Sequence, residues 1–165
     1  MKSPLVPADE AERLAALRDL LILDTSPEER FDGLTRFCQS RFGVKTVLVS
    51  LVDENRQWFK SACGLDVSET PRAVSFCGHA ILAREPFVIP DARFDERFAD
   101  NPLVTGPPHI RFYAGVPLVL SSGFAVGTLC LIDPGPRSFQ DEDLRDLADV
   151  ARTVVRELER SDAEG

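Results

Sequence analysis

Residues Ile110 to Asp133 read IRFYAGVPLVLSSGFAVGTLCLID, and this stretch decides the fold. Two arms rich in apolar residues flank Ser121-Ser122-Gly123, a loop of hairpin length whose glycine is free to take a positive φ. Both faces of the arms are largely apolar, and strands of that kind are normally covered on both faces. The stretch therefore predicts a β-hairpin in the middle of a sheet, with helices packed on each side.

Alternation along the arms predicts which side chains share a face. One set of alternating positions comprises Ile110, Phe112, Ala114, Val116 and Leu118, then Phe124, Val126, Thr128, Cys130 and Ile132. The opposite set contains Val119, Ala125, Leu129 and Leu131. Pro117 has no N–H to donate to a neighbouring strand, so we expect a bulge or a strand end there.

Three further helices follow from apolar spacing. Asp9 to Leu21 carries an apolar stripe formed by Leu14, Leu17, Leu20 and Leu21. A second helix starts with Ser26 as N-cap, Pro27 at the first position and Glu29 completing a capping box. It ends at Gly43, and its predicted buried side is Phe31, Leu34, Phe37, Cys38 and Phe42. Ser138 starts the last helix, whose narrow stripe suits a helix-to-helix seam and comprises Leu144, Leu147, Ala151, Val154 or Val155, and Leu158.

The middle of the chain predicts shorter elements. Val44 to Asp53 and Arg56 to Cys63 read as a second hairpin, followed by a loop from Gly64 to Ala73. Ser75 caps a short helix, and residues 87–89 form a strand between two prolines. Residues 91–108 form a long polar connection with a helical turn near 95–99. Connections of that length are usually functional or carry short helices.

This order of elements predicts an α/β (α+β) three-layer sandwich. Consecutive strands joined by tight turns give a central antiparallel sheet of about five to six strands. Helices from both ends of the chain cover one face, and the middle segment covers the other. We expect one domain over residues 9–160, with a loose leader at 1–8 and a tail at 161–165.

Composition excludes several classes of function. The 165 residues carry a formal net charge of −8 with no run of basic residues, which argues against nucleic acid and anionic membranes as partners. No apolar run is long enough to span a membrane, and the start is too polar for a signal peptide. We therefore expect a cytoplasmic protein with four reduced thiols, at Cys38, Cys63, Cys77 and Cys130.

Six motifs resemble the GAF domain family of small-molecule sensors. They are ILDTSPEERFDGL at 22–34, VSLVDENRQWFKS at 49–61, ETPRAVSFCGHAI at 69–81, NPLV at 101–104, IRFYAGVPL at 110–118 and GTLCLID at 127–133. The resemblance implies a three-layer fold, a ligand pocket between sheet and middle loops, and a homodimer through the terminal helices. Within the family, the sequence is similar to the subgroup that precedes histidine kinase and diguanylate cyclase domains in longer chains. We expect a sensor without its own output domain, acting on such a partner by contact.

The candidate pocket gathers polar and aromatic residues from the middle segment and the central hairpin. They are Trp58, Arg72, Ser75, Phe76, His79, Asp91, Arg111 and Tyr113. Arg72 or Arg111 would hold a carboxylate or phosphate in bidentate fashion. The alternative interpretation is that Arg72, Asp91 and Arg111 form structural ion pairs. Likewise, His79 would be a satisfied buried histidine, and Trp58 would pack in the core instead of stacking on a planar ligand.

Two alternatives to a sensor stay open, a ligand-free dimerisation module and a thiol enzyme. Some proteins similar to GAF domains are free methionine-R-sulfoxide reductases with a cysteine upstream of the strand matching VPL. No cysteine lies between Cys77 and Cys130, so no catalytic residue is assigned. The Cys-His pair of bilin-binding relatives and the cyclic-nucleotide signature are both missing from the sequence. Cys77, His79, His109 and Cys130 lack compact ligand spacing, so no metal site is predicted, and the cofactor stays unknown.

Overall fold

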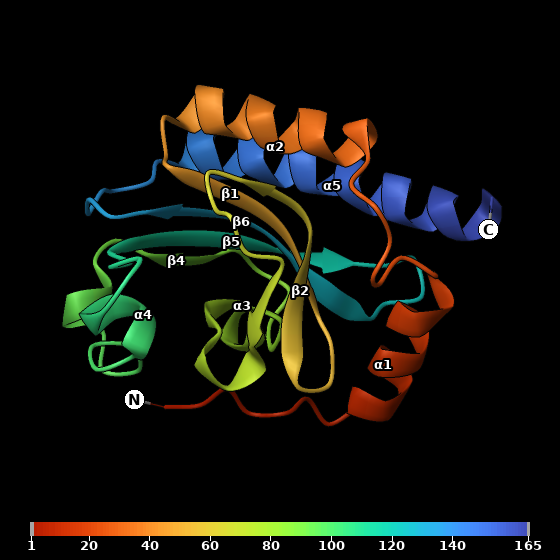
Figure 1. The fold of residues 1–165 in the computed structure, drawn as a ribbon, viewed down its shortest axis with the longest axis horizontal. Helices are drawn as coiled ribbons and strands as arrows, with labels where there is room; N and C mark the ends of the chain where they lie inside the picture. Colours follow the sequence, from red (N-terminus) through yellow and green to blue (C-terminus); the bar gives the residue numbers. More distant parts are fainter. Residues whose placement is uncertain (1, 165) are drawn as a thin grey trace.

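The computed structural model describes residues 2–164, with side chains described as far as Arg160. One antiparallel sheet runs in the order β3-β2-β1-β6-β5-β4, which confirms the predicted fold class (Figure 1). The strands are β1 (Thr46–Val52), β2 (Arg56–Cys63), β3 (Glu69–Pro71), β4 (Phe87–Ile89), β5 (Phe112–Val119) and β6 (Ala125–Asp133). The helices are α1 (Glu10–Asp19), α2 (Glu29–Phe42), α3 (Phe76–Ala80), α4 (Pro102–Thr105) and α5 (Asp141–Glu164), with 3₁₀ turns η1 (Arg72–Val74) and η2 (Ala92–Phe94).

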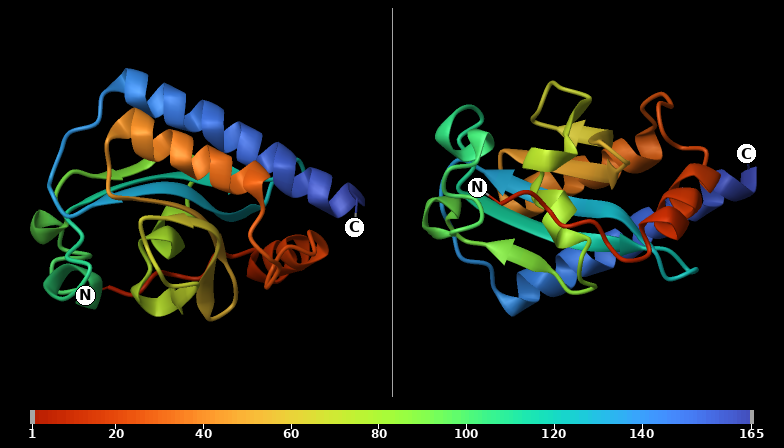
Figure 2. Two further views of the ribbon diagram at one scale, coloured as in Figure 1. Left: turned by 45° about the horizontal axis from the view of Figure 1, so that its top comes forward. Right: turned by 90° about the horizontal axis from the view of Figure 1, so that it is seen from below.

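Helices cover both faces of the sheet in three layers. Helices α2 and α5 lie side by side on one face, and α3 and α4 lie on the other (Figures 1 and 2). Helix α1 was expected on the same face as α5, but it packs at the end of the sheet beside β6. The segment before it, expected to be a loose leader, runs across α3 (Figure 2), and Lys2 N donates to Arg97 O, between η2 and α4, at 3.2 Å.

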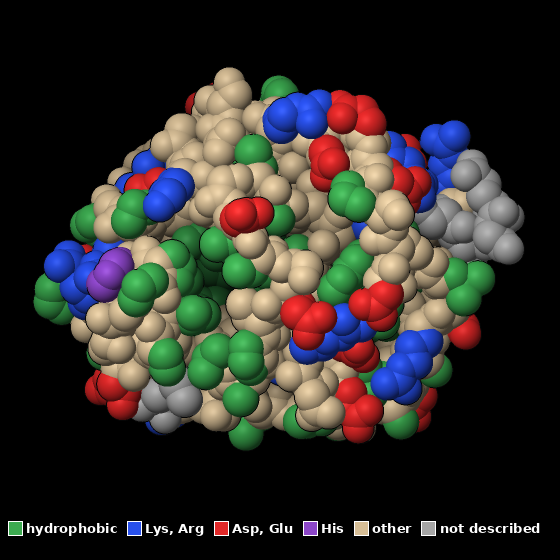
Figure 3. Space-filling view, in the orientation of Figure 1, with side chains coloured by type: hydrophobic (Ala, Val, Ile, Leu, Met, Phe, Trp, Pro, Cys, Tyr) green, Lys and Arg blue, Asp and Glu red, His purple; other side chains and the backbone are tan. Residues whose placement is uncertain are grey.

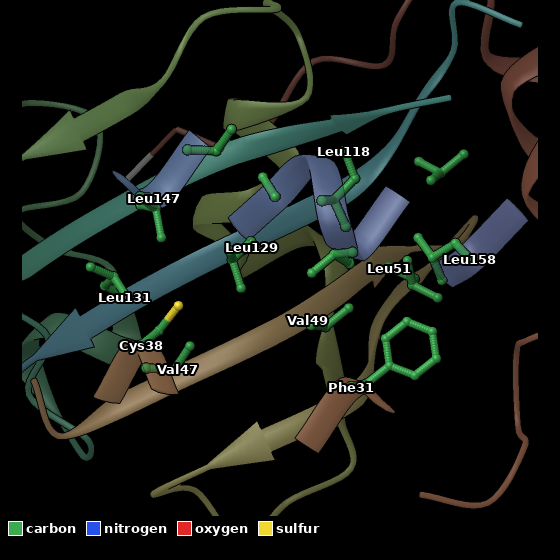
Figure 4. Close-up of a cluster of buried hydrophobic side chains, with 14 of the residues drawn as sticks. Phe31, Cys38, Val47, Val49, Leu51, Leu118, Leu129, Leu131, Leu147 and Leu158 are labelled. Atoms are coloured by element: carbon green, nitrogen blue, oxygen red, sulfur yellow. The ribbon is translucent and has the colours of Figure 1, made fainter. Parts of the chain in front are cut away.

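The core on the α2–α5 face, called the helix-side core, contains the leucine stripe of α5. Leu147, Val154 and Leu158 are fully buried there against the sheet (Figure 4). On the sheet, Leu129 and Leu131 of β6 point into the same cluster. Four residues of the predicted stripe therefore pack within this chain, namely Leu147, Ala151, Val154 and Leu158, whereas Leu144 stays partly exposed.

The alternation of the central hairpin slips at its turn end. Phe112, Leu118 and Val126 lie in the helix-side core, whereas Ile110 and Cys130 lie on the opposite face. The prediction that all five share a face is therefore wrong. The pairing of β5 with β6 shifts register between Leu118 and Val119, and this irregularity reverses the alternation along β6, so that Cys130 faces away from Val126. Ile110 lies before β5 begins at Phe112, outside the alternation of that strand.

Pro117 lies inside β5, one position before the register shift. The ladder between β4 and β5 ends at Phe87 and Gly115, so β5 has a strand neighbour only on its β6 side at Pro117. A residue without an N–H is tolerated where one side of a strand is unpaired.

The predicted N-cap at Ser26 is wrong, because α2 begins at Glu29. Lys60 on β2 has a fully buried side chain, and its ammonium group needs acceptors. It donates to the Ser26 carbonyl, to Thr25 Oγ1 at 2.8 Å and to Glu28 Oε2 at 2.8 Å. Thr25, Ser26 and Glu28 therefore surround this lysine, and the segment before Glu29 does not form the first helical turn.

Four smaller expectations also differ from the structure. Leu21 is 63% exposed with φ 55°, and Phe37 is 55% exposed on the outer side of α2. The loop at 64–73 contains the edge strand β3, whose apolar content is too low to predict it. Helix α5 begins at Asp141, three residues after Ser138, and continues to Glu164 through the predicted tail, of which Gly165 lies outside the described residues.

A Gly33→Ala substitution tests the helical contribution of α2. An added Cβ meets only the ends of two flexible side chains, the Glu29 carboxylate at 3.3 Å and Arg36 Nη2 at 3.9 Å, so helix propensity decides the outcome. We expect the free energy of unfolding to rise by about 0.5 to 1 kcal/mol in urea titrations. Gly43→Ala serves as the control, because Gly43 ends the helix at φ 64°, where alanine is strained. This variant should lower the free energy of unfolding by about 1 kcal/mol. Equal effects of both changes would contradict the helix assignment.

Candidate functional site

A cavity of about 300 Å³ that opens to the surface lies between the sheet and the middle segments of the chain. Figure 3 shows the molecular surface hollowed in the region between α4 and α3, with hydrophobic side chains around the recess. Both the sheet and the covering loops contribute to its walls, which are almost entirely apolar. The lining residues are Leu48, Gln57, Phe59, Leu65, Val67, Thr70, Phe76, Cys77, Leu103, Pro107, Pro108, Ile110, Tyr113 and Ile132.

Aromatic rings form one wall of the cavity. The Ser75 side chain accepts a hydrogen bond from Gly78 N at 3.0 Å, which starts α3 as predicted and orients Phe76. The Phe76 ring stacks on Phe98 with centroids 4.1 Å apart and lies 5.2 Å from the Tyr113 ring. Such pairs are worth about 1 kcal/mol beyond their buried area, so this wall is rigid.

A short polar chain crosses the opposite wall. Ser50 Oγ donates to Gln57 Oε1 at 3.1 Å, and Gln57 Nε2 donates to Thr70 Oγ1 at 2.6 Å. The hydrogen bonds fix the Gln57 amide where it can offer an acceptor or donor to a bound molecule. The chain links the central strand β1 to the edge strand β3.

Thiols and hydroxyls meet at the floor of the cavity. Cys77 Sγ lies 3.0 Å from Thr128 Oγ1, 3.2 Å from the Tyr113 hydroxyl and 4.0 Å from Cys130 Sγ. Burial raises the pKa of Cys77, but its hydrogen bonds to Cys130 and to the neighbouring hydroxyls lower that pKa to about 7. The hydrogen bond to Cys77, together with burial, raises the pKa of Cys130 well above its ordinary value, so Cys77 ionises first.

Arg72 is buried away from the cavity. Its guanidinium pairs with Glu10 of α1 and donates to Asp53 O at 3.1 Å. Glu10 also accepts from Arg13, at 2.7 Å. Arg72 therefore anchors α1 and the turn after β1, and it is the structural ion pair that the sequence offered as an alternative.

The remaining predicted residues are also separated from the cavity. Asp91 caps η2 and pairs with Arg93 at 2.7 Å, and Arg111 donates to Val104 O at 2.8 Å, pinning α4. The His79 ring faces the segment before α1, where Nε2 lies 3.0 Å from Lys2 O. Trp58 packs in the helix-side core on the opposite face of the sheet. Only Phe76 and Tyr113 of the eight predicted residues line the cavity, and Ser75 supports it.

A larger groove of about 670 Å³ runs between α2 and the loop after β2. Two hydroxyls of its wall are already paired, since Thr35 Oγ1 lies 2.8 Å from Ser61 Oγ and Ser61 Oγ donates to Asp32 at 2.6 Å. The smaller cavity is the stronger candidate because its walls are almost entirely apolar and aromatic rings form one of them. Among the described residues, no three His, Cys, Asp or Glu side chains come together to hold a metal ion.

The protein family follows from comparison with known proteins. A family model described as GAF domain matches residues 26–158. The chain belongs to the GAF domain family. This GAF domain is 41% identical over 159 residues to the cyclic di-GMP phosphodiesterase PA2567 of Pseudomonas aeruginosa. That match covers 96% of the chain but 27% of the relative, so the chain spans about a quarter of that protein's length.

Solved structures share the fold of this GAF domain at low sequence identity. The GAF domain of an Acinetobacter phosphoenolpyruvate-protein phosphotransferase has a TM-score of 0.70 and 18% identity, covering 96% of this chain and 97% of the other. A free methionine-R-sulfoxide reductase from Neisseria meningitidis, solved with its substrate, has a TM-score of 0.68 and 17% identity over 100% of both chains. At these identities the likeness shows the fold alone.

Sequence reasoning missed most of the cavity because its walls come from many separate segments. Leu65 and Val67 stand two apart in an otherwise polar predicted loop, and this spacing was the available signal. The sequence predicted a site from charged residues of the middle segment instead, although most of them form hydrogen bonds to backbone groups or ion pairs with each other.

None of the described helices is long and apolar enough to cross a membrane.

Proposed function

We propose that this GAF domain is the sensory domain of a signalling protein and that its cavity binds a small molecule. The observation that carries the proposal is the mostly apolar cavity of about 300 Å³ between the sheet and the loops. Pockets of about this size, with few polar groups, are the usual form of small-molecule sites. The proposal assigns the domain a binding role and no catalytic residue.

The cavity walls favour a neutral ligand with one polar end. No charged side chain lines the cavity, so a phosphate or a zwitterionic amino acid would lose its hydration there without a counter-charge. The Gln57 amide and Thr70 hydroxyl would hold the polar end, and Phe76 and Tyr113 would pack against the apolar part. Free methionine sulfoxide, a zwitterion, fits these walls poorly, so we prefer a sensor to a reductase.

Two strands offer a route from the cavity to the surface helices. Leu48 on β1 and Ile132 on β6 line the cavity. Their neighbours in sequence, Val49 and Leu131, face the helix-side core. A ligand that binds one arrangement of the loops better than another would shift these strands against α2 and α5. The helices would then carry the change to a partner.

The partner and assembly state are part of the same proposal. The Pseudomonas relative is a cyclic di-GMP phosphodiesterase. This supports a partner enzyme of cyclic di-GMP turnover, such as a phosphodiesterase or diguanylate cyclase, in preference to a histidine kinase. A homodimer would have to use the outer surfaces of α2 and α5, where Phe37 is exposed, since the leucine stripe is buried. We place the domain in the cytoplasm, where its four free thiols stay reduced.

Native mass spectrometry of the purified protein tests the proposal without added ligand. We expect a discrete extra mass on the wild-type protein and its loss in Leu103→Trp, because the larger ring fills the cavity from α4. Leu82→Trp is the matched control, since Leu82 is 43% exposed outside the cavity and should leave the mass in place. A bare wild-type protein, or a mass retained by Leu103→Trp, would count against the proposal.

A further inference from the structure

We infer that Cys77 and Cys130 form an oxidation site at the floor of the cavity, where a small neutral hydroperoxide converts the two thiols into a disulfide. The four cysteines are free in the structure, and only this pair is close together. The reaction is independent of reversible ligand binding, since it needs only the two thiols and access through the cavity.

The two thiols come from elements that the fold brings together across 53 residues of sequence. Cys77 lies on α3 and lines the cavity, and Cys130 lies on β6 directly beneath it. Their Sγ atoms are 4.0 Å apart, and a disulfide needs about 2.05 Å. Closing that gap requires the two side chains to rotate, and Cys77 borders the cavity on one side.

Hydroxyl groups surround Cys77 and prepare it as the attacking thiol. Thr128 Oγ1 lies 3.0 Å and the Tyr113 hydroxyl 3.2 Å from its sulfur, and hydrogen bonds to sulfur stabilise the thiolate. Burial raises the pKa of Cys77, but the hydrogen bond to Cys130 and those to the hydroxyls outweigh burial and lower that pKa to about 7, whereas burial alone raises the pKa of Cys38 to about 12. Cys38 is therefore inert, and Cys130 is assigned the second, resolving step by its position 4.0 Å from the Cys77 sulfur and not by its own acidity.

The walls select the oxidant by charge and size. Cys77 is 2% exposed and is reached through an apolar cavity with no charged lining residue. Hydrogen peroxide and small organic hydroperoxides are neutral and enter such a space at low cost. Glutathione disulfide and similar charged reagents are too large and lose their hydration there.

The chemistry proceeds in two balanced steps. The Cys77 thiolate attacks one peroxide oxygen, so an S–O bond forms, the O–O bond breaks, and hydroxide leaves and takes up the thiol proton as water. The sulfur is oxidised by two electrons to a sulfenic acid. Cys130 then attacks that sulfur, an S–S bond forms, the S–O bond breaks, and a second water leaves with the Cys130 proton. The disulfide ties α3 to β6, and an added dithiol reduces it again.

Thiol mapping after mild oxidation tests the inference. Reduced protein is treated with equimolar hydrogen peroxide, quenched with catalase, unfolded, alkylated with N-ethylmaleimide and digested for mass spectrometry. We expect a Cys77–Cys130 disulfide peptide, with Cys38 and Cys63 alkylated, and oxidation at Cys77 at least about tenfold faster than at Cys38. Recovery of alkylated Cys77, or oxidation of the more exposed Cys63 in its place, would overturn the inference.

Variants separate the attacking role of Cys77 from the resolving role of Cys130. In Cys130→Ser the sulfenic acid on Cys77 has no resolving thiol, so dimedone should label Cys77, and Cys130→Ala should behave in the same way. Cys77→Ser should lose the reaction, while Cys63→Ser should react like the wild-type protein. Dimedone labelling absent from both Cys130 variants would contradict the assigned order of attack. Failure of ligand binding with oxidation intact would remove the proposed function alone.

Discussion

Gly127→Ala will lower the free energy of unfolding by about 3 kcal/mol, because the added carbon has no room beside the central strand. An ideal Cβ at this position lies 1.9 Å from Ser50 O and 2.9 Å from Leu51 Cα, and both are backbone atoms of β1. Backbone atoms of a paired strand cannot turn aside as a flexible side chain can. The strands β1 and β6 must separate locally, which weakens the middle of the sheet.

Urea unfolding followed by fluorescence measures this effect, since Trp58 is the only tryptophan and is buried. A loss of that size is a large fraction of the roughly 5 to 15 kcal/mol that stabilises a domain. Gly33→Ala is the matched control, because the same chemical change in α2 should be stabilising. A Gly127→Ala protein with the wild-type urea midpoint would show that β1 and β6 are not packed as described.

Glu10→Gln will cost about 2 kcal/mol at neutral pH by removing the shared anion of two buried guanidinium groups. The side chains of Arg13 and Arg72 are 1% and 8% exposed, so neither can recover its hydration in place. Glu10 itself keeps 17% exposure, which places the cost at the low end for buried ion pairs. Glu12→Gln is the control, because Glu12 is exposed on the same helix and should change stability very little.

The cost of Glu10→Gln will depend on pH in a definite direction. Burial alone raises the pKa of Glu10, but hydrogen bonds and charges from Arg13 and Arg72 outweigh it and lower the pKa below 4.5. The stabilisation is therefore complete above pH 4.5 and is lost as pH falls through the lowered pKa of the folded state. Urea titrations across this range should show the wild-type and variant stabilities converge in acid. A difference that grows in acid would contradict the assignment.

Local patterns predicted the parts of the fold that local physics decides. The hairpin at residues 110–133 was predictable because alternation and turn chemistry act within a few residues. The cap formed by Ser75 was predictable for the same reason, since its side chain accepts from Gly78. The cap at Ser26 failed because Lys60, 34 residues further along, takes that carbonyl.

The candidate site was harder to predict because distant contacts create it. Arg72 pairs with Glu10 across 62 residues, and without that partner in view its charge suggests a ligand site. The thiols of Cys77 and Cys130 meet only because α3 packs over β6. Phe76 and Tyr113 were predictable because Ser75 fixes the start of α3 and because alternation along β5 puts Tyr113 on the face opposite Phe112.

Titration of the ¹⁵N-labelled protein with indole tests the central claim, that the cavity is the ligand site, most directly. Indole is neutral and mostly apolar with one N–H donor, as the cavity walls require. We expect amide shifts confined to cavity-lining residues such as Phe76, Tyr113 and Ile132, and binding at least about tenfold weaker in Leu103→Trp. Shifts centred on the groove beside α2, or no shifts at saturating indole, would contradict the claim.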